Sequence, residues 1–364
     1  MQTSRDVIDC LLRGKKADRV GVADSPWGDT LSEWVKQGMP VDEKGEAVDV
    51  VEHFGFDLCG CGGWFAWEAK RGVCDVLEET DEWRITRNGS GAALKYWKHK
   101  SGTPEHIDFL MTDRSVWERD YRPHLLELDR NRIDVEGTAE ELARRRKQGL
   151  WTSFGGLFIW EIMRASMGDY TMYMSLVSDP AWVHDFNSVY TDMFKAHYKV
   201  LLEEAGRPDG VWLYEDLGYK GRLFCRPQVL ADVIFPYYSE LVEFFHSYDL
   251  PVVFHSCGFT EPAIDLIVAA GFDGLNPMEV KAGNNPLRIA DAYADKLAFF
   301  GGLDARILES GDRGLIRREV AGLIEGMKER GARYVFGSDH SLSTNVEYGD
   351  FEYALEVYRE HMMY

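Results

Sequence analysis

A histidine and a cysteine lie two residues apart at the end of an apolar run in the second half of the chain. The run Pro251–Gly258 reads PVVFHSCG, so valines and a phenylalanine lead into His255 and Cys257. Side chains alternate along a strand, so these two side chains would point to the same side. Zn²⁺ binds imidazole nitrogen and thiolate sulfur well. The spacing predicts a metal-binding pair at a strand end, although a core histidine beside a buried thiol would show the same pattern.

Two further candidate ligands follow at the ends of later apolar runs. Glu279 closes the run Gly274–Glu279, and His340 follows the run Arg333–Asp339. With His255 and Cys257 they would form a site of three or four protein ligands, and a site with one exchangeable position is typical of catalytic zinc. The fourth ligand stays open between His340, Asp339 and none. A solvated carboxylate and a hydrogen-bonded loop histidine are the alternatives.

Acidic and aromatic residues form a second group of candidates around the segment Trp212–Lys220. Alternation should turn one of Glu215 and Asp216 inward, and we expect Asp216 to act in acid/base chemistry or substrate orientation. Tyr219 would line the same cavity. The residues expected to contact the substrate are Glu215, Glu161, Trp27 and Trp64. Helix capping, helix surface and core packing are the competing interpretations of these residues.

Composition narrows the class of protein. The 364 residues carry a formal net charge of −20, which argues against a nucleic-acid or anionic-membrane surface. Apolar residues make up 45% of the chain, yet no apolar run approaches the roughly 20 residues of a membrane span. The cysteines are six and irregularly spaced, and the N-terminus lacks an apolar targeting core. We therefore expect a cytoplasmic protein with reduced cysteines.

These candidate residues need a scaffold, and the pattern of the chain predicts an α/β fold. Eight short β-type runs end in glycine or a polar residue, and helical segments separate the later runs. The helical segments are 229–248, 261–270, 286–294 and 315–330. The β-type runs are 19–24, 56–60, 150–155, 210–216, 251–258, 271–279, 297–302 and 333–339. Alternating strands and helices imply a parallel sheet, and eight strands fit a (β/α)₈ TIM barrel, whose active residues follow the strands.

One segment, from about residue 75 to 131, departs from this alternation. Residues 82–90 read as a strand entering an Asn88-Gly89 turn, and residues 93–98 read as the returning strand. We expect a β-hairpin insertion after strand two, either beside the mouth of the barrel or at an oligomer contact. No flexible linker separates the segments, so residues 1–364 are taken as a single domain.

The quoted motifs resemble those of the uroporphyrinogen decarboxylase superfamily, in particular its cobalamin-dependent methyltransferase branch. The resemblance rests on His255–Gly258, Glu215–Tyr219, Phe300–Asp304 and Asp18–Val20, and it spans the chain. It implies a (β/α)₈ barrel whose zinc ion activates a thiol methyl acceptor. Cobalamin-independent methionine synthases are similar in spacing, with His255, Cys257 and Glu279 at their ligand positions.

The chain departs from this resemblance in two places. Where those relatives have a last zinc-binding cysteine, residues 337–340 read GSDH, which makes the site harder and opens it to acceptors other than coenzyme M. Uroporphyrinogen decarboxylases resemble one another in an arginine-rich amino-terminal stretch that grips propionates. Here residues 22–29 read VADSPWGD and are acidic. Decarboxylation of uroporphyrinogen is therefore not expected.

The expected function is that of a zinc-dependent methyltransferase, which would move a methyl group between a small methylated compound or a methyl-corrinoid and a thiol or similar acceptor. The chain contains no corrinoid-binding Asp-x-His-x-x-Gly run, so a corrinoid (cobalamin) would arrive on a separate protein. The alternatives are a metal-assisted decarboxylase, lyase or hydrolase acting on a small acid, and a non-catalytic ligand-binding barrel. A homodimer is left open, and neither nucleic acid nor membrane is expected as a partner.

Overall fold

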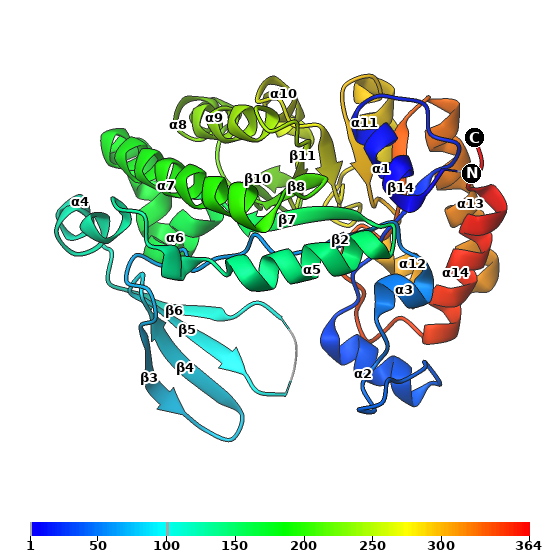
Figure 1. Ribbon diagram of the computed structural model, residues 1–364, viewed down its shortest axis with the longest axis horizontal. Coiled ribbons are helices and arrows are strands. Elements are labelled where there is room, and N and C mark those ends of the chain that lie inside the picture. Colours follow the sequence, from blue (N-terminus) through cyan, green and yellow to red (C-terminus); the bar gives the residue numbers. More distant parts are fainter. Residues whose placement is uncertain (1, 100–101) are drawn as a thin grey trace.

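The computed structural model describes residues 2–99 and 102–364, and its centre is a barrel of parallel strands (Figure 1). Within the described residues, the sheet has eight strands in the order β1-β14-β13-β12-β11-β8-β7-β2, and every pairing along this order is parallel. The strands are β1 (Gly21–Val22), β2 (Leu58–Gly60), β7 (Trp151–Leu157), β8 (Gly210–Tyr214), β11 (Val252–His255), β12 (Gly274–Asn276), β13 (Ala298–Phe300) and β14 (Arg333–Phe336). Each overlaps one of the predicted runs, and β7 alone continues two residues past its run, so the predicted α/β barrel is confirmed.

The end strands β1 and β2 meet through one residue and thereby close the barrel. The backbone N–H of Asp57, just before β2, donates to the carbonyl of Val22 over 2.8 Å, and the Asp57 carboxylate accepts the N–H of Val22 over 2.8 Å. The guanidinium of Arg19 binds the same carboxylate with two hydrogen bonds of 2.6 and 2.7 Å. Asp57 is fully buried, so this seam is a buried ion pair built into the sheet.

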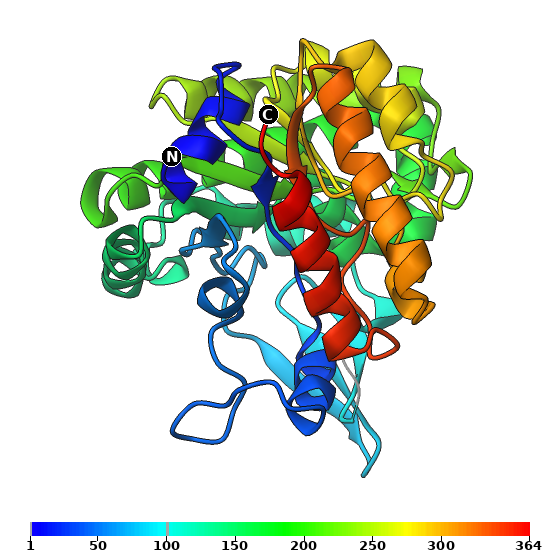
Figure 2. The ribbon, with the colours of Figure 1, turned by 90° about the vertical axis from the view of Figure 1, so that its right-hand side faces the viewer.

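Helices surround the barrel and follow its strands, as Figure 2 shows for α13 and α14, which lie side by side. Their bounds are α2 (Gly28–Lys36), α3 (Val50–Phe54), α5 (Val135–Lys147), α6 (Ile159–Ser178), α7 (Pro180–Val200), α8 (Pro227–Val233), α9 (Phe235–His246), α10 (Ile264–Ala269), α11 (Pro286–Tyr293), α12 (Ala305–Glu309), α13 (Arg313–Glu329) and α14 (Tyr348–His361). The helix predicted over 229–248 is two helices, because Pro236 lacks an N–H and its ring cannot continue a regular turn. In the described residues, no helix is both long and apolar enough to span a bilayer.

A first helix, α1 (Ser4–Leu12), closes the end of the barrel where the strands begin. Thr3 caps it through a reciprocal pair of hydrogen bonds with Asp6. Its apolar side packs into the barrel with inward-facing residues of the strands. This inner cluster contains Val7, Ile8, Leu11, Leu12, Trp151, Trp212, Val253, Phe300 and Val335. The filled interior leaves the opposite end, where the strands finish, as the mouth of the barrel.

The insertion after β2 is a sheet rather than a single hairpin. The predicted strands around the Asn88-Gly89 turn are β4 (Trp83–Asn88) and β5 (Ala92–Trp97), and they are flanked by β3 (Cys74–Glu79) and β6 (Glu105–Phe109). Among the described residues, these four strands form an antiparallel sheet in chain order. Figure 1 shows this sheet projecting beside α6 and the short α4 (Arg114–Val116). The ring of Phe109 lies over Gly168 of α6, where a Cβ would be 2.4 Å from it.

Candidate metal centre at the mouth of the barrel

Three predicted residues converge where β8 and β11 end. His255 is the last residue of β11, Cys257 follows it by two residues, and Asp216 follows the end of neighbouring β8 by two residues. One ligand atom from each lies within 4.8 Å of the others. The Nε2 atom of His255 is 3.4 Å from the Cys257 sulfur and 3.7 Å from a carboxylate oxygen of Asp216. The structure thus brings together the predicted His-Cys pair and the predicted catalytic carboxylate.

The spacing of these atoms fits a tetrahedral metal ion. Bonds of about 2.0–2.3 Å to nitrogen, oxygen and sulfur place the ligands of a tetrahedral zinc ion about 3.5 Å apart. The distances from His255 Nε2 to the other two atoms match that separation. One nitrogen, one sulfur and one carboxylate oxygen also form a donor set that zinc accepts, with a fourth position open to water or substrate.

Asn276 orients the imidazole of His255 and was not anticipated from the sequence. The two residues are paired in the register between β11 and β12, and the Asn276 side-chain oxygen meets Nδ1 of His255. The Asn276 amide nitrogen donates to the Phe300 carbonyl over 3.3 Å, which fixes the amide with its oxygen toward the ring. Nδ1 of His255 is therefore the protonated nitrogen, and Nε2 presents its lone pair to Cys257 and Asp216. The signal available in the sequence was an asparagine ending the strand next to His255.

The loop that carries Cys257 is held from both sides. The backbone N–H of Cys257 donates to Asp216 over 2.8 Å, and the N–H of Gly258 donates to Glu279 over 2.7 Å. Gly258 has φ of +79°, and a Cβ there would lie 2.2 Å from the backbone of Gly218. A glycine is required at this turn because the loop after β8 packs directly against it. The turn predicted after Cys257 is confirmed.

Burial keeps the imidazole of His255 neutral, and burial together with the neighbouring carboxylates keeps the thiol of Cys257 protonated. Burial raises the pKa of the Cys257 thiol well above its usual range, and the negative charges of Asp216 and Glu279 raise it further. Burial also lowers the pKa of His255. A neutral imidazole is the form that binds metal, and a bound cation would offset the charge of a thiolate in this acidic environment.

Glu279 and His340, the other two predicted ligands, lie near the group of three but are not part of it. One Glu279 oxygen accepts the N–H of Gly258, and Glu279 lies three residues past the end of β12 rather than at the strand end. His340 is half-buried, with Nδ1 3.2 Å from the carbonyl of Ser341. The charges of both act on His255. Their role as ligands stays a prediction. Asp339 uses both oxygens to accept the N–H groups of Val280 and Ala305.

Glu215 was predicted to contact the substrate, but its side chain is buried and binds the backbone at the start of α6. Its side chain is fully buried, and its oxygens accept the backbone N–H groups of Phe158 and Trp160 over 2.7 and 2.8 Å. The hydroxyl of Tyr238 donates to the same carboxylate. Alternation along the strand correctly predicted that Asp216, and not Glu215, faces the mouth. Glu215 fixes the start of α6, a contact that depends on tertiary structure.

The start of α6 carries Glu161 and Arg164 toward the mouth. Arg164 donates to Glu161 over 2.7 Å, and its guanidinium lies 4.8 Å from the centre of the Phe224 ring. Burial raises the pKa of Glu161 to about 7, Arg164 opposes that shift, and the charge of Asp216 adds to it. Tyr219, in the short strand β9 (Gly218–Tyr219), stacks on Phe224 at 5.2 Å and is partly exposed. Glu161 and Tyr219 thus lie on the α6 side of the mouth.

The two predicted tryptophans differ in position. The ring of Trp64, after β2, lies 5.3 Å from that of Tyr214, which itself lies 4.9 Å from the His255 ring. Trp27 begins α2 after β1, and in the sheet order β1 is four places from β11 in either direction around the barrel. Trp64 therefore adjoins the candidate metal centre, whereas Trp27 lies across the mouth from it.

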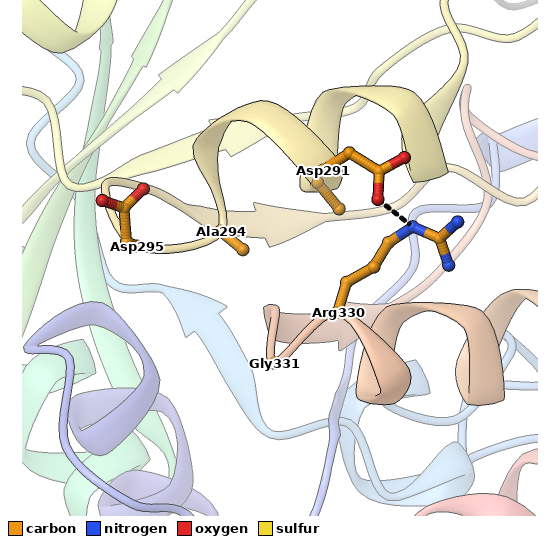
Figure 3. A pocket seen from close by; sticks show the side chains of 6 residues that line it. Asp291, Ala294, Asp295, Arg330 and Gly331 are labelled. Carbon is orange, nitrogen blue, oxygen red and sulfur yellow. Dashed lines mark ion pairs between the residues drawn. The ribbon is translucent and has the colours of Figure 1, made fainter.

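Two surface hollows in the described residues lie away from this mouth. One, of about 350 Å³, adjoins the seam at Arg19 and Asp57. The other, of about 390 Å³, lies between the C-terminal ends of α11 and α13, where Arg330 pairs with Asp291 over 2.8 Å (Figure 3). These helix ends precede β13 and β14, so this hollow is at the end of the barrel where the strands begin. Neither hollow is lined by Asp216, His255 or Cys257.

Comparison with known proteins agrees with this architecture. In three dimensions the chain is similar to a methyltransferase from Methanosarcina mazei, with a TM-score of 0.66, 13% sequence identity and 99% of each chain covered. It is similar over a smaller part of its fold to D-allulose 3-epimerase from Methylomonas sp., with a TM-score of 0.38, 14% identity, and 65% of this chain and 78% of the epimerase covered. At 13% identity the likeness to the methyltransferase shows the fold alone. No protein with a curated description matches the sequence.

The family is shown by the sequence itself. The model of the family described as uroporphyrinogen decarboxylase (URO-D) matches residues 161–361, which is more than half of the 364 residues. The matched part includes Asp216, His255, Cys257 and the strands from β8 to β14. The resemblance predicted from the motifs is therefore confirmed, and the chain belongs to the uroporphyrinogen decarboxylase family.

Proposed function

We propose that the protein is a zinc-dependent methyltransferase that moves a methyl group between a small methylated compound or a methyl-corrinoid and a thiol or similar acceptor. The observation that carries the proposal is the convergence of His255 Nε2, the Cys257 sulfur and the Asp216 carboxylate at the barrel mouth. Active sites of (β/α)₈ barrels lie at this end of the strands. The fold-level likeness to the methyltransferase from Methanosarcina mazei is consistent with it.

In this proposal the three residues hold the zinc ion, and Asp216 takes the third position in place of an acid/base role. Zinc bound there would supply positive charge that lowers the pKa of a thiol acceptor. Asn276 keeps the His255 lone pair directed at the site, and Glu279 holds the Cys257 loop through Gly258. The Glu161–Arg164 pair would orient the methyl donor, since it adjoins Asp216. Any corrinoid would be presented by a separate protein.

The acidic mouth favours this function over decarboxylation of a polycarboxylate. Asp24, Glu161, Asp216, Glu279 and Asp339 all follow barrel strands or begin the next helix. Burial raises the pKa of Asp24 to about 6, and the charge of Asp339 contributes. A substrate with several carboxylates would meet like charges here. A cation, metal or organic, would be attracted instead.

The test is metal content together with methyl transfer. Purified protein should bind about one zinc per chain, and a chelator should remove both the zinc and the transfer of methyl from methyl-cobalamin to a thiol. Readdition of zinc should restore transfer. Carbon dioxide release from small acids, measured in parallel, separates the lyase alternative. Protein that takes up no zinc, or that transfers methyl equally well without it, contradicts the proposal.

Removing the support of the imidazole should weaken the metal site without abolishing it. In Asn276→Ala, Nδ1 of His255 loses its partner, and the ring is free to rotate and to exchange tautomers. Loss of such a partner costs about 10–100-fold in metal affinity. Zinc affinity measured by competition with a chromophoric chelator checks this, with the exposed Asn345→Ala as the control. Equal affinities in Asn276→Ala and wild type would contradict the assigned role.

A further inference from the structure

Trp64 is a large apolar side chain that the fold leaves exposed at the candidate site. The residue is 55% exposed, whereas the rings of Trp151, Trp212 and Phe300 deeper in the barrel are buried. The Trp64 ring packs against the Tyr214 ring, with ring centres 5.3 Å apart and an angle of 34° between the ring planes. Tyr214 in turn lies 4.9 Å from the His255 ring. Trp64 and Tyr214 form an aromatic shelf that leads to the candidate metal centre.

The barrel makes room for this ring through a glycine. Gly155 of β7 faces the indole, and a Cβ at that position would lie 2.7 Å from Nε1 of Trp64. Gly155 lies within β7 and does not have a positive φ, so its backbone conformation does not require a glycine. The missing side chain lets the indole approach the strand closely. The shelf is therefore a built feature of the mouth, with one supporting ring and one cleared position.

Carboxylates lie at the same mouth of the barrel as the shelf. Asp216 lies two residues past Tyr214, the last residue of β8, and its side chain is 39% exposed. Glu161 lies close enough that its charge and that of Asp216 act on each other. Arg164 offsets part of the charge of Glu161 through their ion pair. Aromatic faces attract cations, and recognition of methylated ammonium groups is a known functional use of grouped aromatic side chains.

We infer that the shelf of Trp64 and Tyr214 binds a quaternary methylammonium group at this acidic mouth. Resting on the proposed function, this inference names the class of methyl donor. The transfer then balances without an acid: the C–N bond breaks, its electron pair stays on nitrogen, and a neutral tertiary amine leaves. The methyl group joins the sulfur of the thiol acceptor, and the thiol proton goes to solvent. An uncharged ether or alcohol would instead need a proton on its leaving oxygen.

The experiment measures binding and requires no turnover. Calorimetric titration of the zinc-loaded protein compares choline with 3,3-dimethylbutan-1-ol, which has the same shape and lacks the charge. A cation–π contact at a partly exposed site contributes about 0.5–2 kcal/mol, which corresponds to a preference of about 2–30-fold for choline. Trp64→Ala should remove the preference, and Trp64→Phe should retain part of it. Equal affinity for the two ligands, no choline binding, or a preference that survives in Trp64→Ala would overturn the inference.

A glycine pair gives a matched control for the shelf. Gly155→Ala should displace the indole and reduce the preference, because its Cβ meets Trp64. Gly60→Ala, at the end of β2, places its Cβ in open space and should leave the preference unchanged. If choline binds selectively while no methyl reaches any acceptor, the inference stands and the proposed function fails. If uncharged donors react and choline is not preferred, the proposed function stands and the inference fails.

Discussion

Replacing Cys257 with alanine is expected to release the metal and to lower methyl transfer at least about a thousandfold. The sulfur is one of three converging donor atoms, and its removal leaves His255 and Asp216 as two ligands 3.7 Å apart. Activation of a nucleophile by a bound metal is worth several kcal/mol, and about 4 kcal/mol corresponds to a factor of a thousand in rate. Metal analysis of the purified variant, beside its transfer rate at saturating substrate, measures both effects.

Two further variants are needed to interpret the loss of zinc and activity in Cys257→Ala. Cys10→Ala changes a half-buried free thiol in α1, at the opposite end of the barrel, and should keep both zinc and activity. His340→Ala decides between the ligand sets: retained zinc indicates the three-residue centre seen here, and lost zinc makes His340 the fourth ligand. A Cys257→Ala protein that is active and free of metal would contradict the proposed mechanism. An inactive Cys257→Ala protein that keeps its zinc would remove Cys257 from the ligand set.

The barrel could be predicted from the sequence because its strands are buried on both sides. Parallel strands of this kind are short, apolar and β-branched, and each predicted run coincides with all or most of one. Only two of the four strands of the insertion could be predicted, because the outer strands have no buried side. The β4–β5 hairpin has an Asn88-Gly89 turn, whereas all residues of β3 are exposed. A strand without a buried side has no apolar alternation, so β3 and β6 leave little trace in the sequence.

In the candidate site, too, the residues that local patterns identify could be predicted, and those that depend on tertiary contacts could not. His255, Cys257 and Asp216 could be predicted because alternation and strand ends are local properties of the chain. Asn276 could have been inferred from the pairing of β11 with β12, since both strands end in a polar residue at the same level. The burial of Glu215 beneath α6 depends on contacts across 57 residues of sequence. No local pattern distinguishes such a support from a substrate-binding carboxylate.

Replacing Asp57 with alanine is expected to lower the free energy of unfolding by about 3–5 kcal/mol, because a buried ion pair that loses one partner leaves an uncompensated charge. The Arg19 and Asp57 side chains are 13% and 1% exposed, and their hydrogen bond raises the pKa of Arg19. The same carboxylate accepts the N–H of Val22, so the substitution also removes a bond that joins β1 to β2. Urea denaturation followed by circular dichroism measures the change.

A solvent-exposed ion pair provides the matched comparison for the seam. Arg317 of α13 pairs with Glu360 of α14, and both side chains are about half exposed. Arg317→Ala should cost less than about 1 kcal/mol, since exposed pairs are screened by water and salt. A loss of similar size in Asp57→Ala would show that β1 and β2 are held by other contacts. A large loss in Asp57→Ala alone would identify the Arg19–Asp57 pair as the closure of the barrel, on whose shape the alignment of Asp216, His255 and Cys257 depends.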